Sequence, residues 1–450
     1  MSKNKSLFQE FPTINLSQWE EKITKDLKGK SLSVLENETE ENFTLSPYFN
    51  EENSADYAIN NSTEKRKPTT ENNNWDFNQT IVVTDEKKAN KKALISLKEG
   101  VNSLTFKGNN LNLEILLDGI MLEIISVSFL TKKPLEIAQQ LKEICVNRNI
   151  NFKDLKGTIS YNALTSFAKK GTWVSSQKEE FETLKSLVEL TKDSNLNCIA
   201  VGTCTFQKAG ANITQQIAIA LSQGIEYLNY LTDFYTIEEL SSKVEFHFNI
   251  GNNYFFEMAK IRAFRLLWSQ VLKYFGAKET STTINCSTST LFWAKKDVKN
   301  NMLRATSQAM CAITAGADVV SVSTFETEIE LKKSYASRIA NNVHLILKEE
   351  SYFDKVNDPA NGSYYIENLT NKIAKDSWEL LQKIEEYGGF ISCLENNFIA
   401  KEVAKSAEKL IQKYNNGEIT IVGVTKFAQE KSETKLKKES ESNFPKLIIT

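Results

Sequence analysis

The sequence predicts an α/β protein built as a closed (β/α)8 barrel of the TIM type, with an extended N-terminal arm and C-terminal helices. Three observations lead to this prediction. Eight short apolar runs alternate with amphipathic stretches of helical length. Each connection between successive runs is too long for a hairpin, so the strands must be parallel. Eight such units in about 260–300 residues fit a closed barrel better than an open, doubly wound sheet.

The first segment, residues 1–47, is too short to bury a core of its own. Its clearest element is a helix that we expect to begin with a Ser17 cap, followed by Glu20 and Glu21 in the first turn. Residues 48–74 are poor in aliphatic side chains and rich in Asn, Glu, Ser and Thr, which is typical of a solvated, polar linker. The arm therefore needs a surface elsewhere to pack against.

The barrel is expected to span residues 75–355. Its strands are predicted near residues 78–83, 102–107, 121–128, 157–161, 197–203, 244–250, 281–287 and 318–324. Amphipathic helices are predicted at residues 86–99, 134–149, 177–192, 212–230, 253–275, 299–315 and 334–349. On the helix at 253–275, Ile261, Phe264 and Trp268 recur at spacings of three and four, which places one apolar stripe against the strands.

Residues 356–425 are predicted to form a helical segment packed on the barrel. One helix is expected over 371–387, where Gly388 follows as a glycine C-cap, and a second over 397–414. Residues 426–450 alternate Lys with Glu and Ser, so we expect a charged tail.

Composition excludes several classes of function. The chain has 450 residues, of which 41% are hydrophobic and 25% charged, a balance typical of a globular protein. A net charge of -2 gives no electrostatic footprint for nucleic acid or a membrane surface. No stretch approaches the roughly 20 apolar residues of a membrane span, and no signal peptide is recognisable. We therefore expect a cytoplasmic protein that binds neither nucleic acid nor membranes.

The chain is poor in residues for metal or nucleophilic chemistry. Its two histidines, His247 and His344, lie in a predicted strand and on an apolar helix face, so a structural role is the simpler interpretation of both. The six cysteines show no CxxC spacing and sit mostly in apolar surroundings, as buried reduced thiols do. No glycine-rich phosphate loop of either common kind occurs. We expect no metal site.

Three segments carry a more specific signal. Residues 252–268 read Asn-Asn-Tyr-Phe-Phe-Glu-Met-Ala-Lys-Ile-Arg-Ala-Phe-Arg-Leu-Leu-Trp after a predicted strand. Residues 286–289 read Cys-Ser-Thr-Ser, and residues 358–365 read Asp-Pro-Ala-Asn-Gly-Ser-Tyr-Tyr. In this order they resemble the barrel domain of the methylmalonyl-CoA mutase family, the adenosylcobalamin-dependent acyl-CoA mutases. The resemblance extends over most of the chain.

The departures from the family are as informative as the matches. Catalytic chains of the family carry a His that touches the substrate carbonyl; Asn285 stands at that position here, and Ser287 replaces a family Gln. Asn donates a hydrogen bond but does not act as an acid at neutral pH. Full-length members continue into a cobalamin-binding domain with an Asp-x-His-x-x-Gly motif, which these 450 residues do not show. The resemblance thus implies no catalytic residue in this chain.

By resemblance, the chain is expected to be the small (beta), non-catalytic subunit of a heterodimeric methylmalonyl-CoA mutase, which interconverts succinyl-CoA and methylmalonyl-CoA. The expected partner is the catalytic large subunit, which would hold adenosylcobalamin and bind most of the acyl-CoA substrate, while this chain alone would bind no cofactor. Contacts with that partner are expected from Phe8, Phe11 and Trp19 of the arm. A vestigial acyl-CoA pocket is expected from Lys260, Arg262, Arg265, Ser287 and Thr288.

Two other functions remain open. The chain could be a catalytic acyl-CoA mutase barrel that works with a separate cobalamin-binding protein, although Asn285 and Ser287 argue against it. It could also be an independent barrel enzyme with different chemistry. Such an enzyme needs acids, bases or metal ligands at the C-terminal ends of its strands. This sequence places small neutral residues there: Gly202, Asn249, Ser287 and Ser323.

Overall fold

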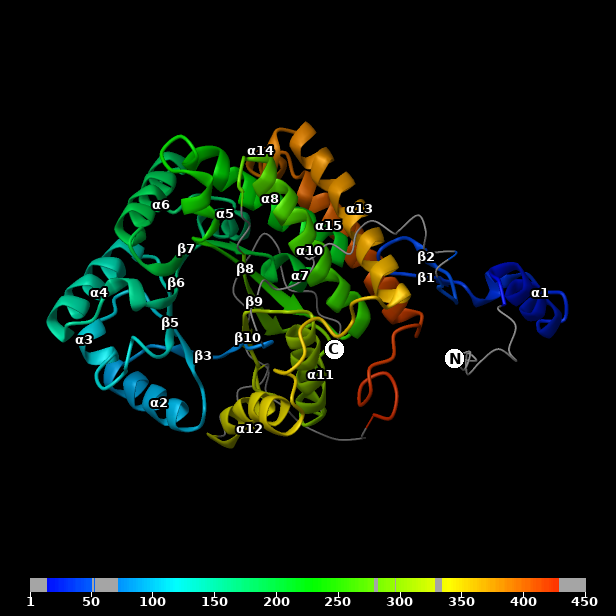
Figure 1. Cartoon of the computed structure of the whole chain (residues 1–450), viewed down its shortest axis with the longest axis horizontal. Coiled ribbons are helices and arrows are strands. Elements are labelled where there is room, and N and C mark those ends of the chain that lie inside the picture. The colour runs from blue at the N-terminus through cyan, green and yellow to red at the C-terminus, as the bar shows by residue number, and fades with distance from the viewer. Residues whose placement is uncertain are drawn as a thin grey trace, which may run out of the picture.

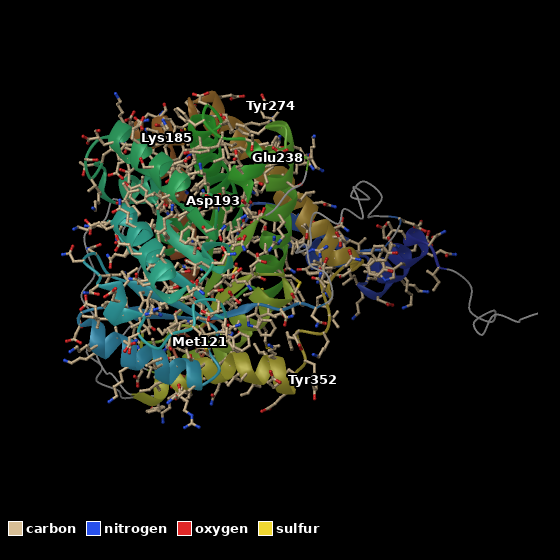
Figure 2. The ribbon with its side chains drawn as sticks, turned by 60° about the vertical axis from the view of Figure 1, so that its left-hand side comes forward. Met121, Lys185, Asp193, Glu238, Tyr274 and Tyr352 are labelled. Carbon is tan, nitrogen blue, oxygen red and sulfur yellow. The ribbon has the colours of Figure 1, made fainter. Side chains whose placement is uncertain are left out.

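The computed structural model describes residues 14–50, 52, 72–278, 282–295, 297–327 and 334–428. The linker predicted at 48–74 and the tail predicted at 426–450 therefore lie largely outside the described residues, as do Phe8 and Phe11 of the arm. Figure 1 shows one large body of strands surrounded by helices, from which α1 (Leu16–Asp26) stands apart. The turned view of Figure 2 shows the same separation.

Eight parallel strands form a closed barrel in the order β10-β3-β4-β5-β6-β7-β8-β9. They are β3 (Asp76–Val82), β4 (Ser103–Lys107), β5 (Ser126–Leu130), β6 (Lys156–Tyr161), β7 (Asn195–Gly202), β8 (Val244–Ile250), β9 (Thr283–Thr288) and β10 (Val319–Ser321). The last strand pairs with the first, with Val319 opposite Asp76. The (β/α)8 barrel predicted from the sequence is confirmed.

Helices cover the outside of the barrel and connect its strands (Figure 1). They are α2 (Glu86–Lys98), α3 (Leu113–Leu116), α4 (Pro134–Arg148), α5 (Ala163–Lys170), α6 (Gln177–Thr191), α7 (Cys204–Lys208), α8 (Ile213–Leu231), α9 (Ile237–Ser241), α10 (Tyr254–Tyr274), α11 (Asn300–Thr314) and α12 (Ser334–Leu345). The sequence pattern does not predict α3, α5, α7 or α9, because elements this short show no clear 3.6-residue period.

Three further helices follow the barrel: α13 (Tyr364–Glu386), α14 (Gly389–Glu395) and α15 (Phe398–Asn415). The long helix α13 packs against both α8 and α10, and α14 packs against α8. At the other end of the chain, β1 (Asn37–Glu38) and β2 (Thr44–Leu45) form a small antiparallel hairpin. In Figure 1 this hairpin lies beside α13, between the barrel and α1.

Most element boundaries differ from the prediction by a few residues, and three of the differences have a clear physical reason. Helix α1 is capped by Asn15, whose side chain accepts the N–H of Gln18 in a capping box, and not by Ser17. Strand β5 begins at Ser126, because residues 122–124 form a turn. Helix α13 begins at Tyr364, well before residue 371, because Ile366 and Leu369 are buried and extend its apolar face by two turns.

Each barrel strand has two faces of different chemistry. On β8, Phe246 and Phe248 pack outward against Phe264 of α10, with ring centroids 4.5 and 4.9 Å apart. The alternate residues of β8, Glu245 and His247, therefore face the barrel axis. Strand register places these residues on the same face: Asp76, Asn78, Ser103, Thr105, Ser126, Ser128, Thr283, Asn285, Ser287, Val319 and Ser321. The axis is mostly polar, whereas barrels of this type usually pack branched aliphatic side chains there.

Candidate functional site

A cavity of about 500 Å³ lies at the N-terminal ends of the barrel strands. Its walls carry hydroxyl, amide and carboxylate groups, and Lys156 and Lys348 add two cations. Axial side chains that line it include Asp76, Ser103, Ser126, Ser128, Thr158, Asn197, Glu245 and Thr283. A polar cavity of this size has room and hydrogen-bonding groups for a small-molecule ligand.

The buried Glu245, the partly buried His247 and the amide of Asn285 lie together on the axis where β8 meets β9. Asn285 donates through Nδ2 to Glu245 Oε1 at 2.8 Å, and His247 Nε2 lies 3.3 Å from Glu245 Oε2. Burial acts to lower the pKa of His247, but the Glu245 carboxylate outweighs it, and the pKa is raised. Burial acts to raise the pKa of Glu245, but the charge of His247 and hydrogen bonds from His247, Thr158 and Asn285 leave it lowered. Each group therefore favours the charged form of the other.

The sequence did not identify this ion pair. The interpretation of His247 as a strand residue is correct. The pattern Glu-Phe-His-Phe-Asn over residues 245–249 also contains the information from which a polar strand face could have been predicted. Strict alternation of aromatic and polar residues in a strand indicates that one face is polar. Asn285, which by resemblance is expected at the family His position, lies on that polar face with its amide bound to Glu245.

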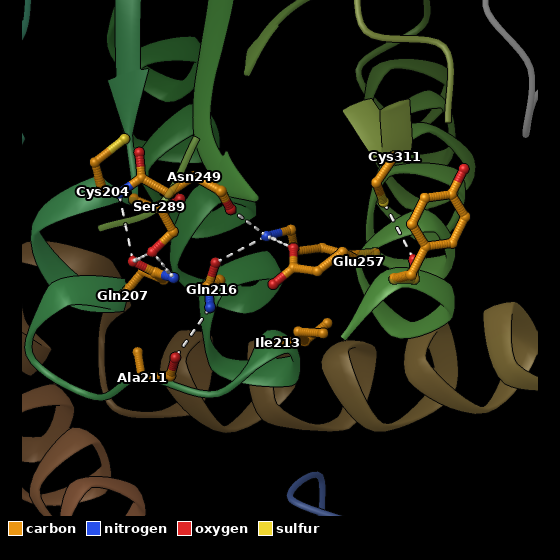
Figure 3. A network of polar contacts seen from close by, with 12 residues as sticks. Cys204, Gln207, Ala211, Ile213, Gln216, Asn249, Glu257, Ser289 and Cys311 are labelled. Atoms are coloured by element: carbon orange, nitrogen blue, oxygen red, sulfur yellow. Dashed lines mark hydrogen bonds and ion pairs between the residues drawn. The ribbon is translucent and has the colours of Figure 1, made fainter. Parts of the chain in front are cut away.

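A second polar network lies at the C-terminal ends of β7, β8 and β9, and Figure 3 shows its members converging. Lys260 donates through Nζ to the carbonyl oxygen of Asn249 at 2.6 Å and to Gln216 Oε1 at 3.2 Å, and it forms an ion pair with Glu257. Gln207 Nε2 donates to Ser289 Oγ at 2.8 Å. These side chains are all buried. The network therefore holds this side of the barrel mouth together.

The five residues expected to form an acyl-CoA pocket make separate sets of contacts. Lys260 belongs to the network just described. Arg262 is buried and pairs with Asp358 and Glu367, joining α10 to the start of α13. Arg265 pairs with Asp318 at 2.8 Å. All three cations are thus neutralised inside the protein.

The two hydroxyl residues of that expected pocket are closer to the axis. Ser287 is partly buried, and strand register places it between Asn249 and Ser321 on the axial face. Thr288 points to the other face of β9, and its Oγ1 accepts the N–H of Ser323 at 2.8 Å. Of the five, Ser287 is the residue that strand register places on the axial face.

Of the residues expected to contact a partner, the structure describes Trp19. Its ring stacks on Tyr48 with centroids 4.3 Å apart, and it is partly buried. It lies on the same face of α1 as Leu16, Ile23 and the C-cap residue Leu27, all of which are partly buried. Helix α1 has no fully buried residue, so this stripe is still available to pack against another surface.

Over the described part of the chain, no group of three or more His, Cys, Asp and Glu residues is arranged to hold a metal ion. All six cysteines are free thiols. Burial raises the pKa of Cys198 to about 11 and that of Cys286 to about 12, so neither is a reactive thiolate at neutral pH. Among the same residues, no helix has both the length and the apolar character to cross a membrane.

Comparison with known proteins extends these observations. The family model described as methylmalonyl-CoA mutase matches residues 108–445. The methylmalonyl-CoA mutase small subunit of Porphyromonas gingivalis is 34% identical over 450 residues, covering 95% of this chain and 72% of that protein. The small subunit of Streptomyces virginiae is 28% identical, covering 94% and 72%. The methylmalonyl-CoA mutase of Rhizobium meliloti is 30% identical over 326 residues, or 71% of this chain but only 46% of that protein. The chain therefore belongs to the methylmalonyl-CoA mutase family.

Proposed function

We propose that this chain is the non-catalytic small subunit of a heterodimeric methylmalonyl-CoA mutase, an isomerase that interconverts succinyl-CoA and methylmalonyl-CoA. The observation that carries the proposal is Asn285. By resemblance, it stands where catalytic chains of the family have a His at the substrate carbonyl, and its side-chain amide is bound to Glu245. A neutral amide held in this way does not act as an acid or a base at neutral pH.

The described residues do not fit adenosylcobalamin ligation by this chain. His344 is buried, and its Nδ1 accepts a hydrogen bond from Trp75 Nε1 at 3.2 Å. His247 is paired with Glu245 inside the barrel. Both imidazoles are thus engaged by neighbouring side chains in the interior of the protein. We therefore assign the cofactor to the partner.

The proposed partner is a related large subunit. Porphyromonas gingivalis has both a protein named methylmalonyl-CoA mutase small subunit and one named large subunit, and this chain is similar to both, at 34% and 28% identity. The internal ion pairs of Lys260, Arg262 and Arg265 leave these cations unavailable for the phosphates of an acyl-CoA. This supports binding of the substrate mainly by the large subunit.

The first test is size-exclusion chromatography that follows cobalamin absorbance, with mutase activity assayed in each fraction. We expect a colourless, inactive chain alone, and a coloured, active one-to-one complex after coexpression with a methylmalonyl-CoA mutase large subunit from the same genome. Turnover of methylmalonyl-CoA by this chain with only a small cobalamin-binding protein added would contradict the proposal. It would show instead that this chain is itself a catalytic barrel.

The arm offers a sharper test of the partnership. Replacing Trp19 with Ala removes the largest apolar side chain of the α1 stripe, and we expect association with the large subunit to weaken by about 2 kcal/mol or more. Trp378→Ala is the matched control, because Trp378 lies on α13 and is 36% exposed. Equal affinity of wild type and Trp19→Ala in a titration would exclude α1 from the interface.

A further inference from the structure

The hairpin formed by β1 and β2 places a buried acidic residue on the barrel. Glu41, in the turn of this hairpin, is only 6% exposed. Its two carboxylate oxygens accept the backbone N–H groups of Ile213 at 2.8 Å and Thr214 at 2.9 Å, which are the first two residues of α8. The first N–H groups of a helix have no partner within the helix, so Glu41 supplies one from a distant part of the chain.

Neighbouring residues of the turn contact three more helices. Asn42 Oδ1 accepts a hydrogen bond from Lys409 of α15 at 2.6 Å. Phe43 stacks on Phe256 of α10 with centroids 6.1 Å apart, and Lys372 of α13 lies 5.6 Å from the same ring. The turn thus joins α8, α10, α13 and α15 at one point.

The arm beyond the hairpin has far fewer contacts with the body. Helix α1 contributes no buried residue, and its Leu16 N–H and Trp19 ring contact Glu52 and Tyr48, which lie just after the arm and not in the barrel. Phe49 reaches Tyr365 of α13 edge-on at 5.7 Å. Within the described residues, the turn containing Glu41 is therefore the main attachment of the arm to the barrel.

The charge of Glu41 is poorly compensated. Within the described residues, no lysine or arginine forms an ion pair with its carboxylate. The nearby charged groups are Glu40 on the same turn, Lys409 and Lys413 on α15, Lys372 on α13 and Glu257 on α10. Burial raises the pKa of Glu40, which Lys413 acts to lower and Glu257 acts to raise further. The positive end of the α8 dipole favours the carboxylate, whereas burial disfavours it.

We propose that Glu41 is a proton-sensitive anchor that fixes the N-terminal arm on α8, and that the arm is held more tightly at mildly acidic than at alkaline pH. Only the consequence for partner association rests on the proposed function, since the arm would then present α1 to the large subunit at a defined position. The anchor itself is a property of this chain alone.

The direction of the pH dependence follows from proton linkage. Burial raises the pKa of Glu41 from 4.5 to about 7, although the N–H groups of Thr214 and Ile213 oppose the shift. The docked turn therefore binds a proton more tightly than the undocked turn, so docking strengthens as the pH falls below about 7. Between pH 6 and pH 8, the fraction of time that the turn is open should increase about tenfold.

Hydrogen–deuterium exchange of the chain alone tests this inference directly, because the amides of Ile213 and Thr214 are the groups that Glu41 protects. After correction for intrinsic rates, we expect their exchange to be about tenfold faster near pH 8 than near pH 6. Glu41→Gln should abolish this difference, and Glu41→Ala should remove protection at both pH values. The matched control is Asp85→Asn, which alters an exposed cap of α2 and should leave both amides unchanged.

Two results would contradict the proposed anchor. Protection that is independent of pH in the wild type, or a pH dependence that survives in Glu41→Gln, would overturn the anchor. Glu41→Gln preserves the size of the side chain, so the test stands even if the alanine variant fails to fold. A chain with the expected exchange behaviour that forms no complex with a large subunit would instead contradict the proposed function, and the anchor would stand.

Discussion

Two regions of the barrel are built from opposite kinds of side chain: the shell, which lies between the strands and the surrounding helices, and the barrel axis. In the shell, Phe246 contacts both Phe264 and Trp268, with ring centroids 4.5 and 4.7 Å apart. On the axis, Ser103 and Thr105 donate hydrogen bonds to the side chain of Asn78 at 3.1 and 2.9 Å. The apolar burial that stabilises this barrel lies in the shell, so the axis is free to carry polar groups.

Strand β8 shows both environments within one element. Its outward residues are apolar and need no hydrogen-bond partner, whereas the inward residues Glu245 and His247 are ionisable and are paired with each other. Burying such groups unpaired would be strongly unfavourable. The axis is therefore stable only while its polar side chains satisfy one another or meet water or a ligand in the cavity.

The strongest test of this contrast is Trp268→Ala in the shell. Trp268 is fully buried, and it packs so closely that a Cβ atom at Gly224 would lie 2.6 Å from its ring. We expect the free energy of unfolding to fall by about 3–5 kcal/mol, measured by chemical denaturation. The control Trp378→Ala, on the partly exposed face of α13, should cost less than about 1 kcal/mol. Similar losses in both variants would show that the shell is not the main source of stability.

The two histidines should give opposite responses to pH. His344 stacks on Phe77 in the shell, and burial lowers its pKa from 6.5 to about 3. The unfolded chain therefore binds the proton more readily, and the stability from neutral His344 is lost as the pH falls below 6.5. This group should lower the free energy of unfolding by at most about 1.4 kcal/mol for each pH unit below 6.5. His344→Gln should abolish that contribution in denaturation curves recorded between pH 7 and pH 5.

His247 should give the opposite dependence of stability on pH. Its pKa is raised above 6.5, because the Glu245 carboxylate outweighs burial, so its contribution is complete below 6.5 and is lost as the pH rises through the raised value. His247→Gln should remove this loss of stability at alkaline pH without changing the dependence of stability on pH in the acid range. If both variants altered the same side of the stability profile, shell and axis would not differ in the way described.

The smallest effect is expected on the axis. Ser103→Ala removes one hydrogen bond to Asn78 Oδ1, but Thr105 still donates to the same atom. We expect a loss of about 0.5–1 kcal/mol in the same denaturation assay. Thr105→Ser is a conservative control that retains the donor. A loss above about 3 kcal/mol for Ser103→Ala would mean that the axis contributes as much as the shell.

Much of the fold was predictable because it depends on local pattern. Strand β8 lies at the residues predicted, and α10 differs from its prediction by one residue at each end, since both carry strong apolar periodicity. The start of α13 was not predicted, because it depends on packing. Tyr365 contacts Phe255 of α10, a residue far away in the sequence.

The candidate site was less predictable than the fold. A basic residue in a family-like segment suggests an anion site, but sequence alone does not show the carboxylate that neutralises it. Arg262 pairs with Asp358, which lies in a loop 96 residues further along the chain. Glu245 and His247 were missed for a related reason: alternation shows that a strand has a polar face, but not whether that face points to the axis or to solvent.

Closure of the barrel has a consequence for how the chain reaches its native state. Strand β10 must pair with β3, and Ser321 and Asn78 are 243 residues apart. Until that pairing forms, both strands present open edges, and such edges are sites for association between chains. A contact of such long range also slows folding. Refolding should therefore be slow and sensitive to protein concentration, and the last step to complete should be the joining of the two ends of the sheet.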